Sequence, residues 1–424
     1  MKSLHIQNAH IVDPAQALDG DGFSLWIQKG KIAAITKTGE SAPFEADETI
    51  DATGLVLSPG LIDLSARLNS IEAELEAAVA GGITSLVVPP DTDPPLDEPE
   101  LADRLVHRAR DIKKSKVLPL GALTLGLKGE QLSELAGLKK AGCVAFSQAS
   151  RAIINTEILH RAMEYAATFG FALWVEPQDY WLSKNGSAHS GVIADRLGLA
   201  TIPVAAETIA IATFLALLRE IPLPLHFHKL SSKAGVQVVL GAIAAGLPVT
   251  FDVDIHHLLM TDSDTDYFNT QARFNPPLRA ESDKNALSQA IIHAKMPIAS
   301  DHTPVGADDK LLPFGEAKPG ATGLEVLLPL TLQWAKSQGL NLLEALAFLT
   351  RFPAKILGLH HLGTLKIDAP ADLILFNPEE TWILNAQNLK SRGKNSPFLN
   401  KTLKGKVHHT IIDGKIVFQN KNPR

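Results

Sequence analysis

Both ends of the chain alternate apolar and polar residues. Residues 4–12 and 24–35 show this alternation around turn-forming residues, and residues 371–376 and 405–418 repeat it. A period of two is typical of strands that bury one face. The sequence therefore predicts β-structure at both ends.

The long middle region follows a different pattern. Short apolar runs such as 85–88 and 117–121 are separated by longer helical stretches such as 100–113. Strand-then-helix alternation over about 300 residues favours a parallel (β/α)8 barrel. A doubly wound parallel sheet is the alternative that this alternation alone leaves open.

We therefore expect an α/β protein with three segments. Residues 58–358 are predicted to form the (β/α)8 TIM barrel, while residues 1–57 and 359–424 supply the two parts of a small β-sandwich. The polar, basic stretch 388–406 is typical of a loop, and we expect it to form an arm on the surface.

Composition limits the class of protein and the cellular compartment in which we expect it. The chain has 424 residues, 45% of them hydrophobic, which is enough for a large core. Its net charge of −6 comes without a basic stripe, so nucleic acid is not an expected partner. The single cysteine, Cys143, excludes an intramolecular disulfide and suits a reducing cytoplasm. Without a signal-peptide core or an apolar run of about 18 residues, we expect a cytoplasmic protein with no membrane span.

Residues 59–69 read Pro-Gly-Leu-Ile-Asp-Leu-Ser-Ala-Arg-Leu-Asn. This stretch resembles Pro-Gly-x-Ile-Asp-x-His-x-His-Leu-Arg, the opening signature of the amidohydrolase superfamily in its dihydroorotase branch. The resemblance covers nearly the whole chain and implies the same plan of barrel and sandwich. Further stretches similar to dihydroorotase motifs follow in family order at 81–84, 90–95, 145–147, 256–258, 275–279, 301–304, 320–325, 353–358 and 395–398.

The resemblance implies a zinc site at the C-terminal face of the barrel. There a metal-bound hydroxide attacks an amide carbonyl of the dihydroorotate ring, with an aspartate as general base. In this chain every ligand position is substituted except that of the aspartate. The positions hold Ser65, Arg67, Gln148, Glu176, Lys229 and, as the retained aspartate, Asp301.

These substitutions remove metal ligands. A hydroxyl such as that of Ser65 is a poor zinc ligand, and the guanidinium of Arg67 has no lone pair to give. His226 and His228 are close to Lys229 in sequence, but residues 228 and 229 of a regular strand point to opposite faces. Without a bulge that shifts the register, we expect the two histidines to have a packing role.

The substituted side chains balance one another in charge. Arg67 and Lys229 carry two positive charges against the two negative charges of Glu176 and Asp301, so this set is neutral without a metal. Because a buried charge needs a partner, we expect ion pairs among these side chains where zinc is bound in the family.

The substrate contacts that the resemblance implies are altered as well. In dihydroorotases an Arg and an Asn hold the substrate carboxylate, and the corresponding residues are Asn69 and Asp91. Asn69 cannot form the bidentate contact of an arginine, and Asp91 would set a negative charge against a negative ligand. His256 and His257 match a His-His pair of the family that does not bind the metal directly.

The chain therefore resembles the non-catalytic dihydroorotase-like subunits of some bacteria. These accompany an active aspartate carbamoyltransferase and are needed for its assembly. The resemblance implies a pseudoenzyme of pyrimidine biosynthesis, with no metal or other cofactor. It also implies a hetero-oligomer with the catalytic chain of aspartate carbamoyltransferase.

Two alternatives stay open. One is an active zinc-dependent amidohydrolase with a remodelled site, in which Asp301 holds one metal together with His228, His302 or Glu176. The other is a sensor that binds a nucleotide or a pyrimidine intermediate in the vacated pocket. Metal analysis tests the first, and a thermal-shift panel tests the second, because a ligand of the folded state raises stability.

Overall fold

A closed ring of parallel strands forms the centre of the molecule. The computed structural model describes residues 2–37 and 39–420. β15 (Val253–Asp254) continues β14 and pairs with β16 (Ile298–Ala299), and a parallel bridge between Ala66 and His302 completes the ring. The other strands, in pairing order, are β6 (Leu61–Asp63), β7 (Ile83–Val88), β8 (Lys116–Ala122), β9 (Ala145–Ser147), β10 (Leu173–Val175), β13 (Leu225–Phe227) and β14 (Val249–Phe251).

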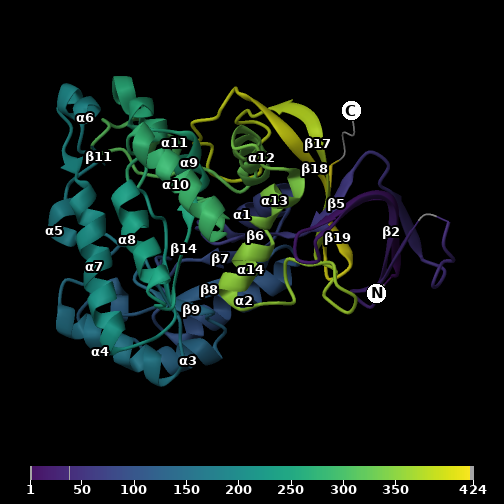
Figure 1. Ribbon diagram of the computed structural model, residues 1–424, viewed down its shortest axis with the longest axis horizontal. Coiled ribbons are helices and arrows are strands. Elements are labelled where there is room, and N and C mark those ends of the chain that lie inside the picture. Colours follow the sequence, from purple (N-terminus) through teal and green to yellow (C-terminus); the bar gives the residue numbers. More distant parts are fainter. Residues whose placement is uncertain (1, 38, 421–424) are drawn as a thin grey trace.

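Helices cover the outside of this ring (Figure 1). In the helix at 204–220, Ile211, Leu215 and Leu218 recur every three or four residues, and all are buried. Inside the ring, Val87 and Trp174 belong to a separate apolar cluster. The covering helices are α1 (Ile71–Ala80), α2 (Pro99–Ile112), α3 (Leu135–Lys140), α4 (Thr156–Thr168), α7 (Val204–Glu220), α8 (Lys233–Ala244), α10 (Glu281–Ala294), α12 (Leu327–Ser337), α13 (Leu342–Ala347) and α14 (Arg351–Leu357).

The two ends of the chain form one mixed sheet beside the barrel (Figure 1). Its strand order is β19 (Lys415–Gln419), β18 (Thr402–Ile412), β17 (Leu373–Ile383), β5 (Val56–Pro59), β1 (Leu4–Asp13), β2 (Leu18–Gln28) and β3 (Lys31–Lys37), with β4 (Glu48–Asp51) paired to β1. β5 joins the two ends, since it pairs in parallel with β1 and antiparallel with β17. Ile6, Ile11 and Leu373 belong to a core that is separate from that of the barrel.

The expected fold class is confirmed. A doubly wound sheet is open and carries helices on both faces, whereas this sheet closes on itself and carries its helices outside. The division into 1–57, 58–358 and 359–424 stays a prediction. None of the described helices is long and apolar enough to cross a membrane.

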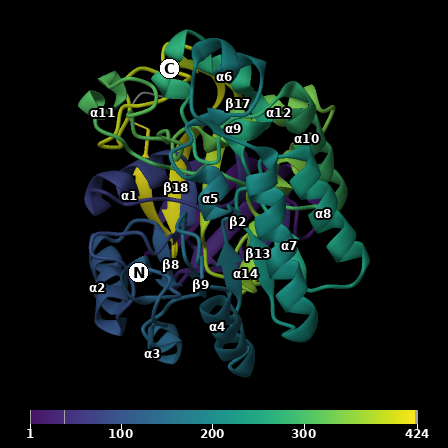
Figure 2. The ribbon, with the colours of Figure 1, turned by 90° about the vertical axis from the view of Figure 1, so that its left-hand side faces the viewer.

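Long excursions leave the C-terminal ends of three barrel strands. Between β10 and α7 the chain forms α5 (Tyr180–Ser183), β11 (Ala188–His189), α6 (Val192–Leu197) and β12 (Thr201–Ile202). After β15 it forms α9 (Ile255–Leu259), η2 (Asp262–Phe268) and η3 (Thr270–Ala272), and after β16 it forms α11 (Ala307–Leu311). α6 and α11 lie at the same end of the molecule in Figures 1 and 2. This end is where TIM barrels carry their functional sites.

The segment 388–406 differs from the surface arm predicted for it. Residues 402–406 belong to β18, and Ser391 is fully buried. The backbone N–H groups of Lys390 and Ser391 donate to the Glu325 carboxylate at 2.9–3.1 Å. Polar groups of this segment therefore form hydrogen bonds inside the molecule. Composition alone does not show whether a polar segment bonds to the protein or to water.

Candidate functional site

Arg67 lies in the barrel mouth and contacts three carboxylates. Its Nε is 3.0 Å from Asp91 Oδ2, and its Nη1 is 3.2 Å from Asp301 Oδ1. Its Nη2 is 3.9 Å from Glu176 Oε1, and its Nη1 also donates to Thr303 Oγ1 at 3.1 Å. The side chain is only 17% exposed, so these charges interact largely away from water.

Lys229 is more deeply buried, with its side chain 2% exposed. Its Nζ is 3.2 Å from Glu176 Oε2 and 3.2 Å from Asp301 Oδ1, and it donates to the backbone oxygen of Asn275 at 3.1 Å. The predicted pairing of Arg67 and Lys229 with the two carboxylates is confirmed.

The backbone at Lys229 brings its side chain into the mouth. β13 ends at Phe227, and Lys229 has a left-handed backbone with φ of 60°. Such a φ is uncommon outside glycine. The regular alternation of side chains along the strand therefore ends before residue 229. His228 bonds Asp252, while Lys229 contacts the carboxylates of Glu176 and Asp301.

Asp301 and the two cations, Arg67 and Lys229, stabilise one another's charged forms. Burial would lower the pKa of Arg67 and of Lys229, but the neighbouring carboxylates outweigh burial and raise both. Burial would raise the pKa of Asp301, but the two cations keep it below its usual range. Asp91 adds a third carboxylate that the sequence reading assigned only to substrate contact.

Ser65 and Gln148 border the network. The Ser65 Oγ donates to Asp301 Oδ1 at 3.4 Å, which is a long hydrogen bond. Gln148 contacts Thr124 Oγ1 through Oε1 at 3.1 Å and through Nε2 at 2.8 Å, so its amide is engaged away from the ion pairs.

Asn69 and Asp91 line a common cavity of about 690 Å³ beside Arg67. Asn69 Nδ2 donates to the backbone oxygen of Pro304 at 2.9 Å, and Asp91 pairs with Arg67. Arg104 of α2 lines the same cavity. The structure thus brings the two altered clamp positions together, but both side chains bond to the protein itself.

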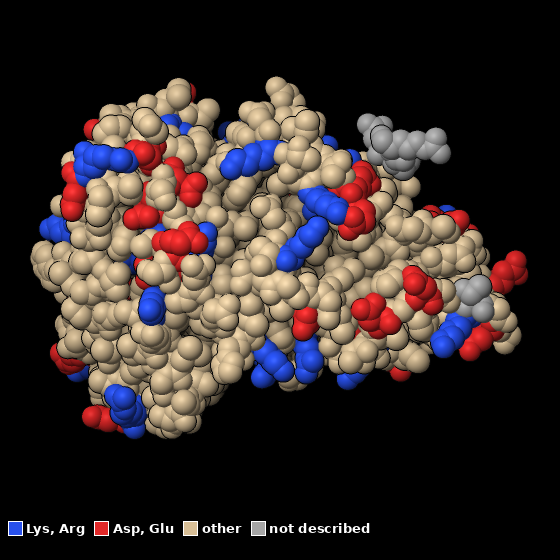
Figure 3. Space-filling view, turned by 45° about the horizontal axis from the view of Figure 1, so that its top comes forward, with Lys and Arg blue, Asp and Glu red and all other residues tan. Residues whose placement is uncertain are grey.

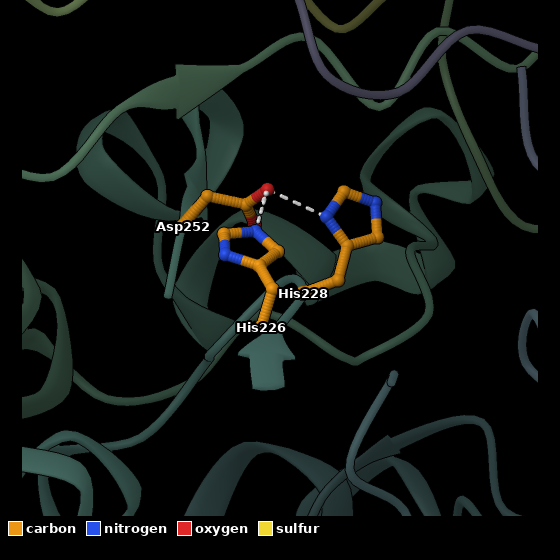
Figure 4. Close-up of side chains that lie close together, drawn as sticks. All are labelled: His226, His228 and Asp252. Atoms are coloured by element: carbon orange, nitrogen blue, oxygen red, sulfur yellow. Dashed lines mark hydrogen bonds and ion pairs between the residues drawn. The ribbon is translucent and has the colours of Figure 1, made fainter. Parts of the chain in front are cut away.

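His226, His228 and Asp252 converge beside the ion-pair network (Figure 4). Asp252 Oδ2 is 2.6 Å from His228 Nδ1 and 3.1 Å from His226 Nε2. His226 Nδ1 lies 2.8 Å from Thr250 Oγ1, and the Lys229 N–H donates to Asp252 Oδ1 at 2.6 Å. In the part of the chain that the structure describes, these three buried side chains form the one His/Cys/Asp/Glu group close enough to hold a metal ion.

The same three side chains also shift one another's pKa values. Burial would raise the pKa of Asp252, but His228 and His226 hold it below its usual range. Burial would lower the pKa of His228, but Asp252 raises it, while burial dominates at His226 and lowers its pKa. Asp252 thus favours the charged form of His228, while burial favours the neutral form of His226. The packing role expected for His226 and His228 stays a prediction, because their ring nitrogens could also bind a metal ion.

Zinc, which the dihydroorotase resemblance implies, does not fit the residues at its expected position. Zinc binds lone-pair donors at about 2.0–2.3 Å, and a guanidinium offers none. Arg67 and Lys229 there point two fixed positive charges at Asp301. The nearby His226, His228 and Asp252 offer suitable donor types, but their shortest separation is 2.6 Å. Ligand atoms around a tetrahedral zinc lie roughly 3.4 Å apart.

His302, the other histidine considered as a ligand, is engaged elsewhere. Its Nε2 is 3.0 Å from Glu74 Oε2, and its Nδ1 accepts from the backbone N–H of Gly323 at 3.0 Å. Both His302 and Glu74 are fully buried. This pair fastens the loop after β16 to α1.

Asp254, His256 and His257 were not assigned a role from the sequence. Both oxygens of Asp254, both ring nitrogens of His256 and Nδ1 of His257 are buried without a hydrogen-bond partner among the described residues. Burial raises the pKa of Asp254 well above its usual range and lowers that of His256 to about 3 and that of His257 to about 4. Burial thus favours the neutral form of each of the three groups, and the neutral form costs less to bury.

Sequence reasoning also missed Asp252, the acceptor that unites His226, His228 and the backbone of Lys229. A signal for it exists, since Asp252 and Asp254 interrupt the apolar strand 249–255. A carboxylate inside such a strand is buried and needs a partner.

Comparison with known proteins supports the resemblance. The dihydro-orotase-like family matches residues 54–246, and the amidohydrolase family matches residues 171–417. L-hydantoinase from Arthrobacter aurescens has the same fold, with a TM-score of 0.87 and 24% identity over 100% of this chain and 97% of that chain.

Relatives match along the whole chain. A dihydroorotase-like protein from Pseudomonas aeruginosa is 42% identical over 98% of this chain and 100% of its own length. A second from Pseudomonas putida is 40% identical over 98% of this chain and 99% of its own. A dihydroorotase from Geotalea daltonii is 37% identical over 98% of this chain and 99% of its own. The chain therefore belongs to the dihydroorotase-like branch of the amidohydrolase family.

Proposed function

We propose that this protein is a non-catalytic dihydroorotase-like protein that acts as an assembly partner of aspartate carbamoyltransferase in pyrimidine biosynthesis. The observation that carries the proposal is the position of Arg67 and Lys229. Their cationic groups lie in the barrel mouth, each 3.2 Å from Asp301. A hydrolase of this family needs that space for a metal and its hydroxide.

The retained aspartate is engaged as well. Asp301 Oδ1 is contacted by Arg67, Lys229 and Ser65. The two cations lower the pKa of Asp301, which makes its carboxylate a weaker general base. Opening dihydroorotate or cyclising carbamoyl aspartate would then lack both the activated nucleophile and the base.

A role in assembly requires the barrel but not its chemistry. Both Pseudomonas relatives are named dihydroorotase-like proteins. Their names say nothing of a partner. The partner follows from the similarity to those family members that accompany aspartate carbamoyltransferase, and fold alone would not give it.

Co-expression with the aspartate carbamoyltransferase of the same organism tests the proposal. We expect that enzyme to be poorly assembled or weakly active alone and to regain assembly and activity with this chain. Light scattering measures assembly, and carbamoyltransferase assays measure activity. Ser65→Ala alters only a 3.4 Å hydrogen bond in the mouth and should rescue as well as the natural chain. A carbamoyltransferase that is fully assembled and active alone, and that ignores this chain, would overturn the proposal.

A zinc-dependent amidohydrolase with a remodelled site is the second candidate, favoured by the convergence of His226, His228 and Asp252. It requires about one zinc per chain and dihydroorotate turnover that a chelator abolishes. His228→Ala should then remove both zinc and turnover. The first proposal instead expects no stoichiometric zinc, background turnover and a melting temperature that chelation leaves unchanged.

A further inference from the structure

The excursions above the barrel mouth leave large apolar side chains in water. Val192 of α6 is 81% exposed, Tyr267 of η2 is 91% exposed, and Leu311 of α11 is 83% exposed. Phe268 and Leu312 follow them in the chain and are also exposed. These five residues form the crest. Groups of exposed apolar side chains are typical of interaction sites.

The elements of the crest are packed together. Phe314, which follows α11, is buried against Ala188 of β11 and Ala194 of α6. Arg196 of α6 is paired with Asp266 of η2 at 2.7 Å. The apolar side chains are thus exposed on a supported surface, and little conformational freedom remains to be lost when a partner binds.

The backbone of η2 turns Tyr267 outward. Tyr267 and Phe268 have left-handed backbones, with φ of 55° and 56°. This conformation is unfavourable for residues other than glycine, and surrounding structure must maintain it. Tyrosine is also enriched among the residues that dominate binding interfaces.

The surroundings of the crest are acidic. Arg196 pairs with Asp266 and Lys318 with Asp309. Two further cations, Lys310 and Arg273, donate to the backbone oxygens of Thr270 and Phe314. In Figure 3, acidic side chains gather at the end of the molecule where Figure 1 has α6 and α11. The exposed carboxylates of this region are Asp195, Asp264, Asp308 and Glu316.

We propose that the crest is the surface that docks the carbamoyltransferase partner, through an apolar patch of that partner flanked by lysine and arginine side chains. This inference rests on the proposed function. Opposite charges across an interface speed association and select one orientation. A second copy of this chain is a poor occupant, because its own crest would bring carboxylates against carboxylates.

The test uses the full chain and the native carbamoyltransferase, titrated against each other with light scattering as readout. Tyr267→Ser combined with Leu311→Ser should weaken binding by about tenfold or more. The melting temperature should not change, because both side chains already face water. Ile367→Ser is the matched control, since Ile367 is 60% exposed but lies in the turn that packs against β3, away from the crest.

The charge of the surface is tested separately. Asp195→Lys combined with Asp308→Lys should slow association and reduce its sensitivity to salt, since fewer opposite charges then attract the partner. Unchanged association rates at low salt would contradict a lysine- and arginine-flanked partner surface.

The possible results distinguish the two proposals. Loss of binding in the crest variant, with normal binding by the Ile367 variant, supports the crest. Equal binding by all variants overturns the crest and leaves the assembly role intact. A natural chain that does not bind carbamoyltransferase overturns the assembly role, and the crest assignment falls with it. A natural chain that self-associates, and becomes monomeric in the crest variant, would make a second copy the occupant and also overturn the inference.

Discussion

Three carboxylates at the barrel mouth depend on one guanidinium. Arg67→Ala would leave Asp91 without its cation and would weaken the neutralisation of Asp301 and Glu176. Breaking a buried pair in this way costs about 3–5 kcal/mol, because the remaining charges stay desolvated. We expect a clear fall in the melting temperature, measured by calorimetry. Arg104→Ala, an exposed arginine of α2, is the control; equal melting of both variants would show that the network contributes little.

Glu325 gives the stability of the protein a specific dependence on pH. Burial raises its pKa from 4.5 to about 6, although the N–H groups of Lys390 and Ser391 donate to it. Between these pH values the folded chain binds more protons than the unfolded chain, so ionisation of Glu325 reduces stability as pH rises through this window. The reduction is about 2 kcal/mol for a shift of this size, and it levels off about one pH unit above the folded pKa.

Glu325→Gln removes this titration. The stability of the natural chain relative to the variant should therefore fall by about 2 kcal/mol between about pH 3.5 and about pH 7, most steeply from pH 4.5 to pH 6, and then remain level. Urea denaturation of both proteins across this range measures the difference. A difference that does not vary with pH would mean that Glu325 titrates normally in the folded protein.

Sequence reasoning predicted the ion-pair partners of the mouth but not their full geometry. Arg67, Lys229, Glu176 and Asp301 could be grouped because the family pattern brings their positions together. Asp91 joins them through the path of the loop after β7, which no periodicity describes. Tertiary contacts likewise set the left-handed backbone at Lys229, so a rule for regular strands could not anticipate it.

At the scale of elements, the segment 388–401 is fixed by Asn395. Its Oδ1 accepts from Val305 N–H and Thr322 Oγ1, and its Nδ2 donates to the backbone oxygens of Thr303 and Gly320, all at 2.9–3.2 Å. Asn395→Ala would leave buried backbone groups unpaired, each at a cost of about 1–3 kcal/mol. We expect lower stability and faster cleavage of this segment in limited proteolysis.

Asn388→Ala is the control, since Asn388 is exposed in the same segment. Identical cleavage of the two variants would mean that other contacts hold the segment. The prediction of a surface arm at 388–406 was wrong, and the hydrogen bonds of Asn395 show why. A polar residue satisfies backbone groups in the interior as readily as it contacts water.

At the scale of the whole molecule, alternation of strands and helices favoured the barrel but left a doubly wound sheet open. The alternating pattern at both chain ends predicted strands there as well. It could not predict that β5 unites both ends in one sheet, because pairing between segments this far apart leaves no local signal. The resemblance implied a small sandwich beside the barrel, but not this pairing of β5 with β1 and β17.

The position of β5 has a consequence for synthesis. β5 ends at Pro59 and its partner β17 begins at Leu373. At roughly 5–20 residues per second, the intervening residues take roughly 15–60 s to be translated. During this delay β5 presents an unpaired edge that can template aggregation with other nascent chains. A chain ending at residue 358 should therefore sediment with the insoluble fraction, whereas equal solubility of the truncated and full-length chains would contradict this. The yield of folded protein then depends on how quickly ribosomes finish the last strands, and on chaperones that shield the first ones meanwhile.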